Sequence, residues 1–139
     1  MKTGWILATL LVTMAMGLTA TLAGGGGNFD KLTDADRQPW LELLNGKLRG
    51  LGNAVLACSA LKESYRKILA QGLGDCRFVH LRGSIELIRA RLAERKHRYM
   101  PASLLESQFA TLEPPVGALA VDIAQPPAQC VEDVCAALR

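Results

Sequence analysis

Val55-Leu56-Ala57-Cys58-Ser59-Ala60-Leu61-Lys62-Glu63-Ser64-Tyr65-Arg66 is the stretch that decides the fold. Its first four residues are apolar and partly β-branched, which predicts a strand buried on both faces. After Ser59 the apolar residues recur with the period of a helix. One helical face then holds Leu61, Tyr65, Ile68 and Leu69, and the other holds Lys62, Glu63, Arg66 and Lys67. A strand, a small-residue turn and a helix in direct succession predict one half of a parallel α/β unit.

Ligands of such sheets bind at the carboxyl ends of the strands, which is where the turn after Cys58 is expected. Lys62 and Arg66 are one helical turn apart, so they would project together near an anion. Solvated surface charges are the alternative, and most Lys and Arg side chains are of that kind. The spacing alone leaves both interpretations open.

Four stretches resemble the gluconokinases, small P-loop kinases that phosphorylate gluconate on its terminal hydroxyl. In chain order they are residues 33–41 (TDADRQPWL), residues 58–69 (CSALKESYRKIL), Leu81-Arg82-Gly83 with Arg91-Leu92, and the segment Tyr99-Met100-Pro101 with residues 104–115 (LLESQFATLEPP). Together they cover roughly residues 31–139. Because the strings CSALK and SQFATLEPP are specific, the chain is identified as a member of this family.

The resemblance implies an α/β fold, a doubly wound parallel sheet of the P-loop kinase type with a small helical lid at about residues 97–115. Alternating strands and helices independently favour a parallel sheet. The family's first two strands have no convincing counterpart, and only the run 5–14 could supply the central one. Without it, the other strands would flank a gap, and the fold would be incomplete or marginally stable.

The family's phosphate-binding loop requires GxxxxGK[ST], in which backbone N–H groups and Lys hold the phosphates and Ser/Thr binds magnesium. Residues 24–31 read GGGGNFDK and are followed by Leu32, so the sequence offers glycines without a Gly-Lys-Ser/Thr. Residues 24–30 are therefore interpreted as a Gly-rich linker. We expect the family reaction, ATP-dependent phosphorylation of D-gluconate to 6-phosphogluconate, to be impaired in this chain.

The apolar run 5–23 carries no charge and follows Lys2, which is typical of a secretory signal peptide or a membrane anchor. A buried element of the fold and a wrongly assigned start of translation are the alternatives. The family itself implies the cytoplasm. A signal peptide that works would instead favour a secreted or anchored binding module on this scaffold, and an inactive truncated relative is a further alternative.

Site residues follow from the resemblance alone, and a catalytic residue is not among them. It implies substrate binding by Asp36, Arg37, Ser59, Lys62 and Arg66, and binding of the ATP phosphates by Arg91 and Arg95. Asp36 and Arg37 could equally be charges that interact with a helix dipole. A solvated face is the alternative for the basic run from Arg89 to Arg98. ATP and Mg²⁺ are the implied cofactors, while His80 is given no role.

Composition excludes several other classes of protein. The net charge of +3 over 139 residues is too small to indicate nucleic-acid binding. The four cysteines form no CxxC pair and no His/Cys metal spacing, so no structural zinc is expected. Cys58 in a core strand and Cys135 on the last helix are predicted to be buried free thiols. Gluconate or a similar sugar acid is the expected partner. Membrane contact through residues 5–23 and a homodimer stay open.

The remaining pattern predicts element boundaries. Thr33 and Asp36 form a capping pair for a helix with Pro39 in its first turn, ending near residues 50–52. Strands are expected at 53–58, 78–81 and 119–123, and helices at 62–71 and 85–96, the second capped by Ser84. Ser103 and Glu106 form a capping box for a lid helix. The predicted apolar stripes are Trp40, Leu43, Leu44, Leu48 and Leu51 in the first helix, Leu105, Phe109 and Leu112 in the lid, and Val131, Val134, Cys135 and Leu138 in the closing helix.

Overall fold

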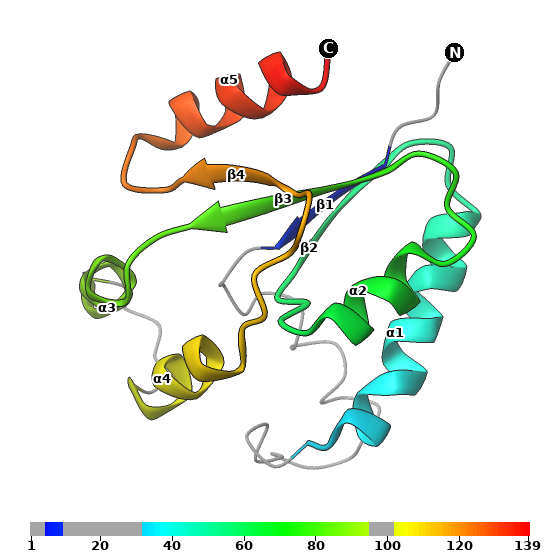
Figure 1. Cartoon of the computed structure of the whole chain (residues 1–139), viewed down its shortest axis with the longest axis horizontal. Coiled ribbons are helices and arrows are strands. Elements are labelled where there is room, and N and C mark those ends of the chain that lie inside the picture. Colours follow the sequence, from blue (N-terminus) through cyan, green and yellow to red (C-terminus); the bar gives the residue numbers. More distant parts are fainter. Residues whose placement is uncertain (1–4, 10–31, 95–101) are drawn as a thin grey trace.

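The computed structural model describes residues 5–9, 32–94 and 102–139 of the chain. Strands and helices alternate along these residues, apart from the two successive helices between β3 and β4 (Figure 1). The elements are β1 (Trp5–Thr9), α1 (Asp34–Arg49), β2 (Ala54–Cys58), α2 (Glu63–Ala70), β3 (Cys76–Arg82), α3 (Ile85–Glu94), α4 (Ala102–Thr111), β4 (Leu119–Asp122) and α5 (Pro127–Ala137).

The sheet is parallel throughout and has the strand order β2-β1-β3-β4. Strand β1, first in the sequence, pairs on one side with β2, from Trp5 opposite Ala54, and on the other with β3, from Trp5 opposite Cys76. The predicted α/β fold class is confirmed, and the described part of the run 5–14, Trp5–Thr9, does form a central strand. The sheet has no gap between β2 and β3, so the expectation that the N-terminal strands are missing is wrong for this one.

Strand β1 also bears on the apolar run 5–23. Its described part, Trp5–Thr9, is a strand of the sheet, so a signal peptide or membrane anchor is not supported at these five residues. Residues 10–23, and the glycine run of residues 24–30, lie outside the described residues. Among the helices that the structure describes, none is both long and apolar enough to cross a bilayer.

Helices α1 and α2 pack against each other and cover one face of the β2 side of the sheet (Figure 1). The buried stripe of α1 consists of Leu41, Asn45 and Leu48. Of the predicted stripe, Leu48 is buried and Trp40 and Leu44 pack against this core, whereas Leu43 and Leu51 are about half exposed. The buried Leu41 was not in the predicted stripe. An apolar pattern with several adjacent leucines does not fix which of them faces the core. The packing against α2 decides it.

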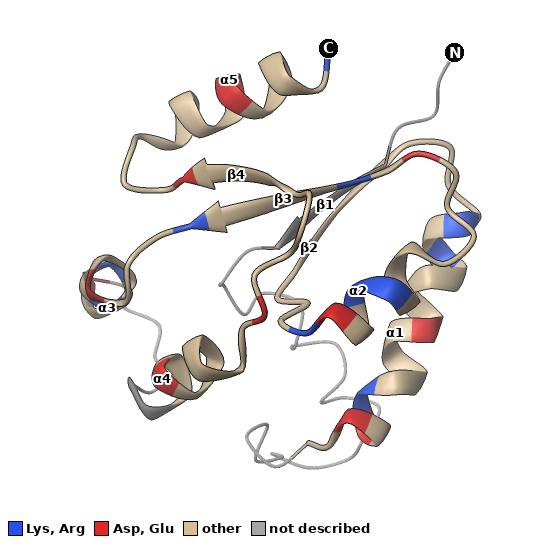
Figure 2. Cartoon of the chain, in the orientation of Figure 1, with Lys and Arg blue, Asp and Glu red and all other residues tan. Residues whose placement is uncertain are grey.

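Local signals at the start of α1 are confirmed. The Thr33 hydroxyl accepts from the Asp36 N–H, and the Asp36 carboxylate accepts from the Thr33 N–H at 2.8 Å, which completes the capping box. Acidic residues stand in the first turn of α1 and basic ones in its last, as the helix dipole favours (Figure 2). Pro39 falls in the second turn instead of the first, because the helix begins at Asp34.

Strand β2 is an edge strand among the described elements, and only one of its faces is covered. Cys58 is buried in the core beside α1 and α2, with Leu56 packed against it, whereas Val55 on the opposite face is 69% exposed. The expectation of a strand buried on both faces is therefore wrong. Burial of a strand depends on its position in the sheet, which four apolar residues do not reveal.

The second half of the chain builds a smaller core beyond the carboxyl end of β3. Ile88 of α3 and Leu105 of α4 are its buried residues, and the partly buried Leu92, Phe109 and Leu112 pack on them. The predicted lid stripe of Leu105, Phe109 and Leu112 is thereby confirmed. The Ser84 hydroxyl accepts from the Leu87 N–H at 3.2 Å and caps α3 as expected. Helix α4 begins at Ala102, so Ser103 lies within the helix and is not its N-cap, contrary to prediction.

Helix α5 lies on the side of the sheet opposite α1 and α2, against β4 (Figure 1). No residue of α5 is fully buried, and its half-buried stripe is Cys130, Val134 and Leu138. Val131 is 61% exposed and Cys135 is also exposed, so the prediction of Cys135 as a buried thiol is wrong. The helix packs along a single narrow line of contact, too narrow to cover the wider apolar face that the sequence shows.

Candidate functional site

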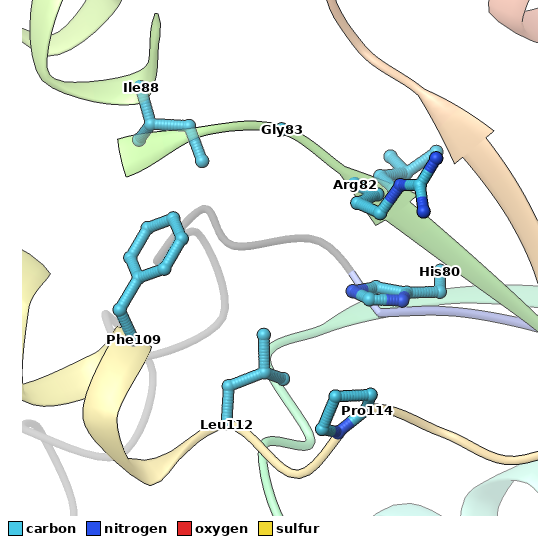
Figure 3. A pocket seen from close by; sticks show the side chains of 8 residues that line it. His80, Arg82, Gly83, Ile88, Phe109, Leu112 and Pro114 are labelled. Atoms are coloured by element: carbon cyan, nitrogen blue, oxygen red, sulfur yellow. The ribbon is translucent and has the colours of Figure 1, made fainter. Parts of the chain in front are cut away.

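A pocket of about 200 Å³ opens at the carboxyl end of β3, the edge at which parallel sheets bind ligands. Its apolar wall comes from α3, α4 and the segment after α4, and its polar groups are His80 and Arg82 on β3 (Figure 3). His80 pairs in register with Thr9, the last residue of β1, so the pocket lies beside the end of the central strand. The complete lining is His80, Leu81, Arg82, Gly83, Ile88, Phe109, Leu112 and Pro114.

Gly83 allows β3 to turn into α3 at the rim of this pocket. A Cβ atom at this position would lie 2.7 Å from Cγ1 of Ile123, closer than real side-chain contacts permit. Only glycine fits without moving the residues that follow β4. The glycine of the LRG string is therefore a packing requirement at the strand end.

The electrostatics of the pocket are positive. Arg82 is exposed and makes no ion pair with any residue that the structure describes. Burial, followed by the charges of Arg66 and Arg82, lowers the pKa of His80 below its ordinary value. His80 is therefore neutral near pH 7, and one ring nitrogen can accept a hydrogen bond while the other donates one. None of the lining residues is acidic.

Arg66, predicted on the solvated face of its helix, is 2% exposed. Its Nη1 donates to the carbonyl oxygens of Ala60 at 2.8 Å and of Leu61 at 3.1 Å. Its Nη2 donates to the Glu113 carbonyl at 2.9 Å, and both Nε and Nη2 contact Oε2 of Glu63. These contacts occupy all five N–H groups of the guanidinium. The alternative of a solvated surface charge is wrong for Arg66, and no donor of its guanidinium is left for a substrate.

The turn before α2 explains why a guanidinium is needed there. Ala60 has a φ of 32°, a left-handed conformation that side-chain-bearing residues rarely adopt. The turn directs the carbonyls of Ala60 and Leu61 toward Arg66, where they are shielded from water. A buried carbonyl without a partner is costly, and the forked donor pairs with both.

Lys62 does not project beside Arg66 as the spacing predicted. Its Nζ contacts both carboxylate oxygens of Asp34 at 2.8 and 2.7 Å, and it lies 5.7 Å from the centre of the Tyr65 ring. The Tyr65 hydroxyl donates to the same carboxylate at 2.5 Å. Hydrogen bonds from Lys62 and then Tyr65 lower the pKa of Asp34. This cluster joins the starts of α1 and α2 on the surface.

None of the other predicted residues that the structure describes lines the pocket. Asp36 completes the cap of α1, and its hydrogen bonds with Thr33 lower its pKa. Arg37 donates weakly to the Leu32 carbonyl at 3.5 Å, and Ser59 is half-buried in the turn after β2. Arg91 is half-exposed on α3, and Arg95 lies outside the described residues.

Sequence reasoning missed the two polar groups of the pocket and the residue that the Arg66 network converges on. His80 and Arg82 are two residues apart on β3 and so share one face of the strand, and their position at the strand end was the available signal. Glu113 stands in the resembling string, but nothing in its local sequence shows a contact with α2. Within the described part of the chain, no group of His, Cys, Asp and Glu is placed to hold a metal ion.

A parallel sheet with its first strand in the centre, and a small helical unit beyond the carboxyl end of β3, have the arrangement of a P-loop kinase fold. The chain is similar to the crystal structure of a gluconokinase from Sinorhizobium meliloti 1021, with 34% identity, a TM-score of 0.78 and coverage of 98% of this chain and 91% of the other. It is also similar to a sugar kinase from Janibacter sp. HTCC2649, with 28% identity, a TM-score of 0.74 and coverage of 99% and 95%.

Curated relatives of the chain are also named gluconokinases. A probable gluconokinase of Xenopus tropicalis is 47% identical over 60% of this chain and 54% of its own length. The thermoresistant gluconokinase of Escherichia coli (strain K12) is 36% identical over 70% and 60%. No family model matches the sequence. The chain belongs to the gluconokinase family, as its motifs predicted, and its matches span only about half the length of these curated relatives.

Proposed function

We propose that this chain binds D-gluconate, or a closely related sugar acid, in the pocket at the end of β3. The observation that supports this most is a concave site beside the end of β1 that combines a neutral His80 with Arg82, whose guanidinium has no ion-pair partner among the described residues. Arg82 would pair with the carboxylate, and the imidazole would exchange hydrogen bonds with the sugar hydroxyls. The relatives named gluconokinase point to the same ligand.

The residues predicted earlier take more distant roles in this proposal. Ser59 and Lys62 lie in the turn after β2, which β1 separates from β3 in the sheet, and would contact the far end of the acid. Asp36 and Arg37 would act only if the sugar acid extended to the start of α1. Arg66 is proposed to act without touching the ligand, because its donors are already occupied.

The reaction proposed for the family scaffold is transfer of a phosphoryl group from ATP to the sugar acid, with Mg²⁺ accompanying the nucleotide, in the cytoplasm where ATP is available. Arg91, and Arg95 if it lies near, would bind the phosphates. Charge alone does not align the phosphates with the attacking hydroxyl. Because the sequence contains no GxxxxGK[ST], we expect ATP binding and transfer to be weak in this chain.

A sugar-acid-binding relative that does not transfer phosphate is the second candidate, and the absent motif in the sequence favours it. A coupled assay for ADP release, with Mg-ATP and with or without D-gluconate, separates the two candidates. We expect no gluconate-dependent ADP from the full chain, and turnover when a family-type phosphate-binding loop is grafted directly after Thr9, the end of the central strand β1. Gluconate-dependent turnover by the unmodified chain would contradict the impaired transfer.

A further inference from the structure

Three hydrogen bonds join the segment after α4 to the start of α2, and all three involve Glu113. Its N–H donates to the Leu61 carbonyl at 2.9 Å, its carbonyl accepts from Arg66 Nη2 at 2.9 Å, and its carboxylate accepts from the Glu63 N–H at 2.6 Å. Both backbone groups and the side chain of one residue are thus directed at the same turn. We call these contacts the Glu113 anchor.

The neighbours of Glu113 face the other way. Leu112 and Pro114, directly before and after it, line the pocket together with Phe109 of α4 (Figure 3). A short segment that is fixed at its middle residue cannot shift as a unit without breaking the anchor. The position of this wall relative to His80 therefore depends on contacts made outside the pocket.

Arg66 is the rigid part of the anchor. Its guanidinium is 2% exposed and connects the Glu113 carbonyl with those of Ala60 and Leu61, so one planar group holds two segments in one geometry. Lysine cannot reproduce this, because it has a single donor atom at the end of a flexible stem. The Glu113 carboxylate in turn accepts from the first N–H of α2, whose N-cap residue Lys62 supplies no side-chain cap.

We infer that Arg66 and Glu113 are positioning residues that hold the Leu112–Pro114 wall of the pocket at its working distance from β3, through contacts that the ligand does not share. The inference relies on the proposed function only for the identity of the ligand. It also explains why Arg66 uses all its hydrogen-bond donors within the protein although it lies beside a candidate site.

Hydrogen exchange measured by mass spectrometry on the full chain tests the inference. Arg66→Lys keeps the charge and loses the fork, and Glu113→Ala loses the carboxylate contact while keeping the two backbone contacts. Glu106→Ala is the matched control, because its carboxylate pairs with Arg89 on the outer surface of α3 and α4 at 3.2 Å. We expect exchange across residues 110–118 to rise about tenfold in Arg66→Lys and less in Glu113→Ala, with β3 unchanged.

D-gluconate is the probe for the consequence at the pocket. Its dissociation constant should rise in both anchor variants, in the same order as the exchange rates, and stay unchanged in Glu106→Ala. Unaltered exchange at residues 110–118 in both anchor variants would overturn the inference, as would an equal rise in every segment, which would make Arg66 a contributor to global stability alone. If Arg66→Lys fails to fold, Glu113→Ala decides. If the wild-type chain takes up no gluconate, the proposed function is wrong and the exchange rates alone decide the inference.

Discussion

The carboxylate of Glu113 accepts a hydrogen bond from the backbone N–H of Glu63, 50 residues away in sequence, with 2.6 Å between Oε2 and N. The contact satisfies the first donor of α2 and places a negative charge at the positive end of the helix dipole. It joins the helix that carries the predicted substrate residues to the segment that closes the pocket. The two halves of the candidate site are thereby mechanically connected.

Arg66→Ala is expected to destabilise the protein strongly. The substitution removes the Arg66 donors to the Ala60 and Glu113 carbonyls and one of the two donors to the Leu61 carbonyl, which keeps the Glu113 N–H. It also takes the partner from the Glu63 carboxylate, and losses of this kind cost about 3 kcal/mol or more. Urea unfolding followed by circular dichroism measures it. Arg77→Ala is the control, because the Arg77–Asp75 pair is exposed and its loss should cost within about 0.5–1 kcal/mol. Equal costs for the two variants would contradict the buried network.

Asn45→Ala should also be costly, for a different reason. The Asn45 side-chain amide is buried and donates to the carbonyls of Leu69 at 2.9 Å and Gln71 at 2.8 Å, which closes the carboxyl end of α2. Leaving both carbonyls unpaired should lower the free energy of unfolding by about 1–3 kcal/mol. Gln38→Ala serves as the control, since Gln38 donates to Glu42 at 2.8 Å on the exposed surface of the same helix. A loss at Asn45 no larger than that at Gln38 would show that water replaces the amide.

The Asp34 cluster gives a pH dependence with a definite sign. Hydrogen bonds from Lys62 and then Tyr65 lower the pKa of the Asp34 carboxyl below its ordinary value of 3.8. The cluster therefore stabilises the fold above about pH 4, and this stabilisation is lost as the pH falls through the folded-state pKa of Asp34. The free energies of unfolding of the wild type and Asp34→Asn should differ at pH 6 and converge below the folded-state pKa of Asp34. A difference in the free energy of unfolding that persists at the lowest pH would contradict the assignment. Glu42→Gln controls for general loss of charge.

Thiol reactivity should distinguish Cys58 from Cys135, both of which the sequence predicted to be buried. Cys135 is exposed on α5, whereas Cys58 is 4% exposed and burial raises the pKa of its thiol. A thiol reagent at pH 8 should modify Cys135 within minutes and Cys58 only after unfolding, because the thiolate is the reacting form. Mass-spectrometric mapping of the modified residues checks the order. Rapid labelling of Cys58 in the folded chain would contradict the packing of β2.

The order of strands and helices could be predicted from the sequence because it rests on local patterns. Thr33 with Asp36, and Ser84 before α3, are signals that need no knowledge of the fold. The prediction for Arg66 failed because helical spacing places charges outside, whereas the turn at Ala60 and the distant Glu113 provide it with buried acceptors. The predicted burial of Val55 failed for the same reason, since the exposure of a residue at a sheet edge depends on strand order and not on the residue type.

The pocket was the harder part to predict. Spacing suggested an anion near Lys62 and Arg66, but Asp34 neutralises the first and backbone carbonyls occupy the second. His80 and Arg82 looked like residues of an ordinary strand, because their role depends on where β3 ends and on which helices lie beyond it. The resemblance supplied the family, and the tertiary structure supplied the candidate residues.

Calorimetric titration of D-gluconate into the full chain tests the central claim most directly, with D-glucose, which lacks the carboxylate, as the matched ligand. We predict saturable binding of gluconate, no measurable binding of glucose, and at least about tenfold weaker gluconate binding in Arg82→Gln, since a charge-assisted pair is lost. Arg77→Gln, at the other end of the same strand, should leave the affinity unchanged. Absence of gluconate binding, or equal affinity in the wild type and Arg82→Gln, would contradict the assignment of the pocket.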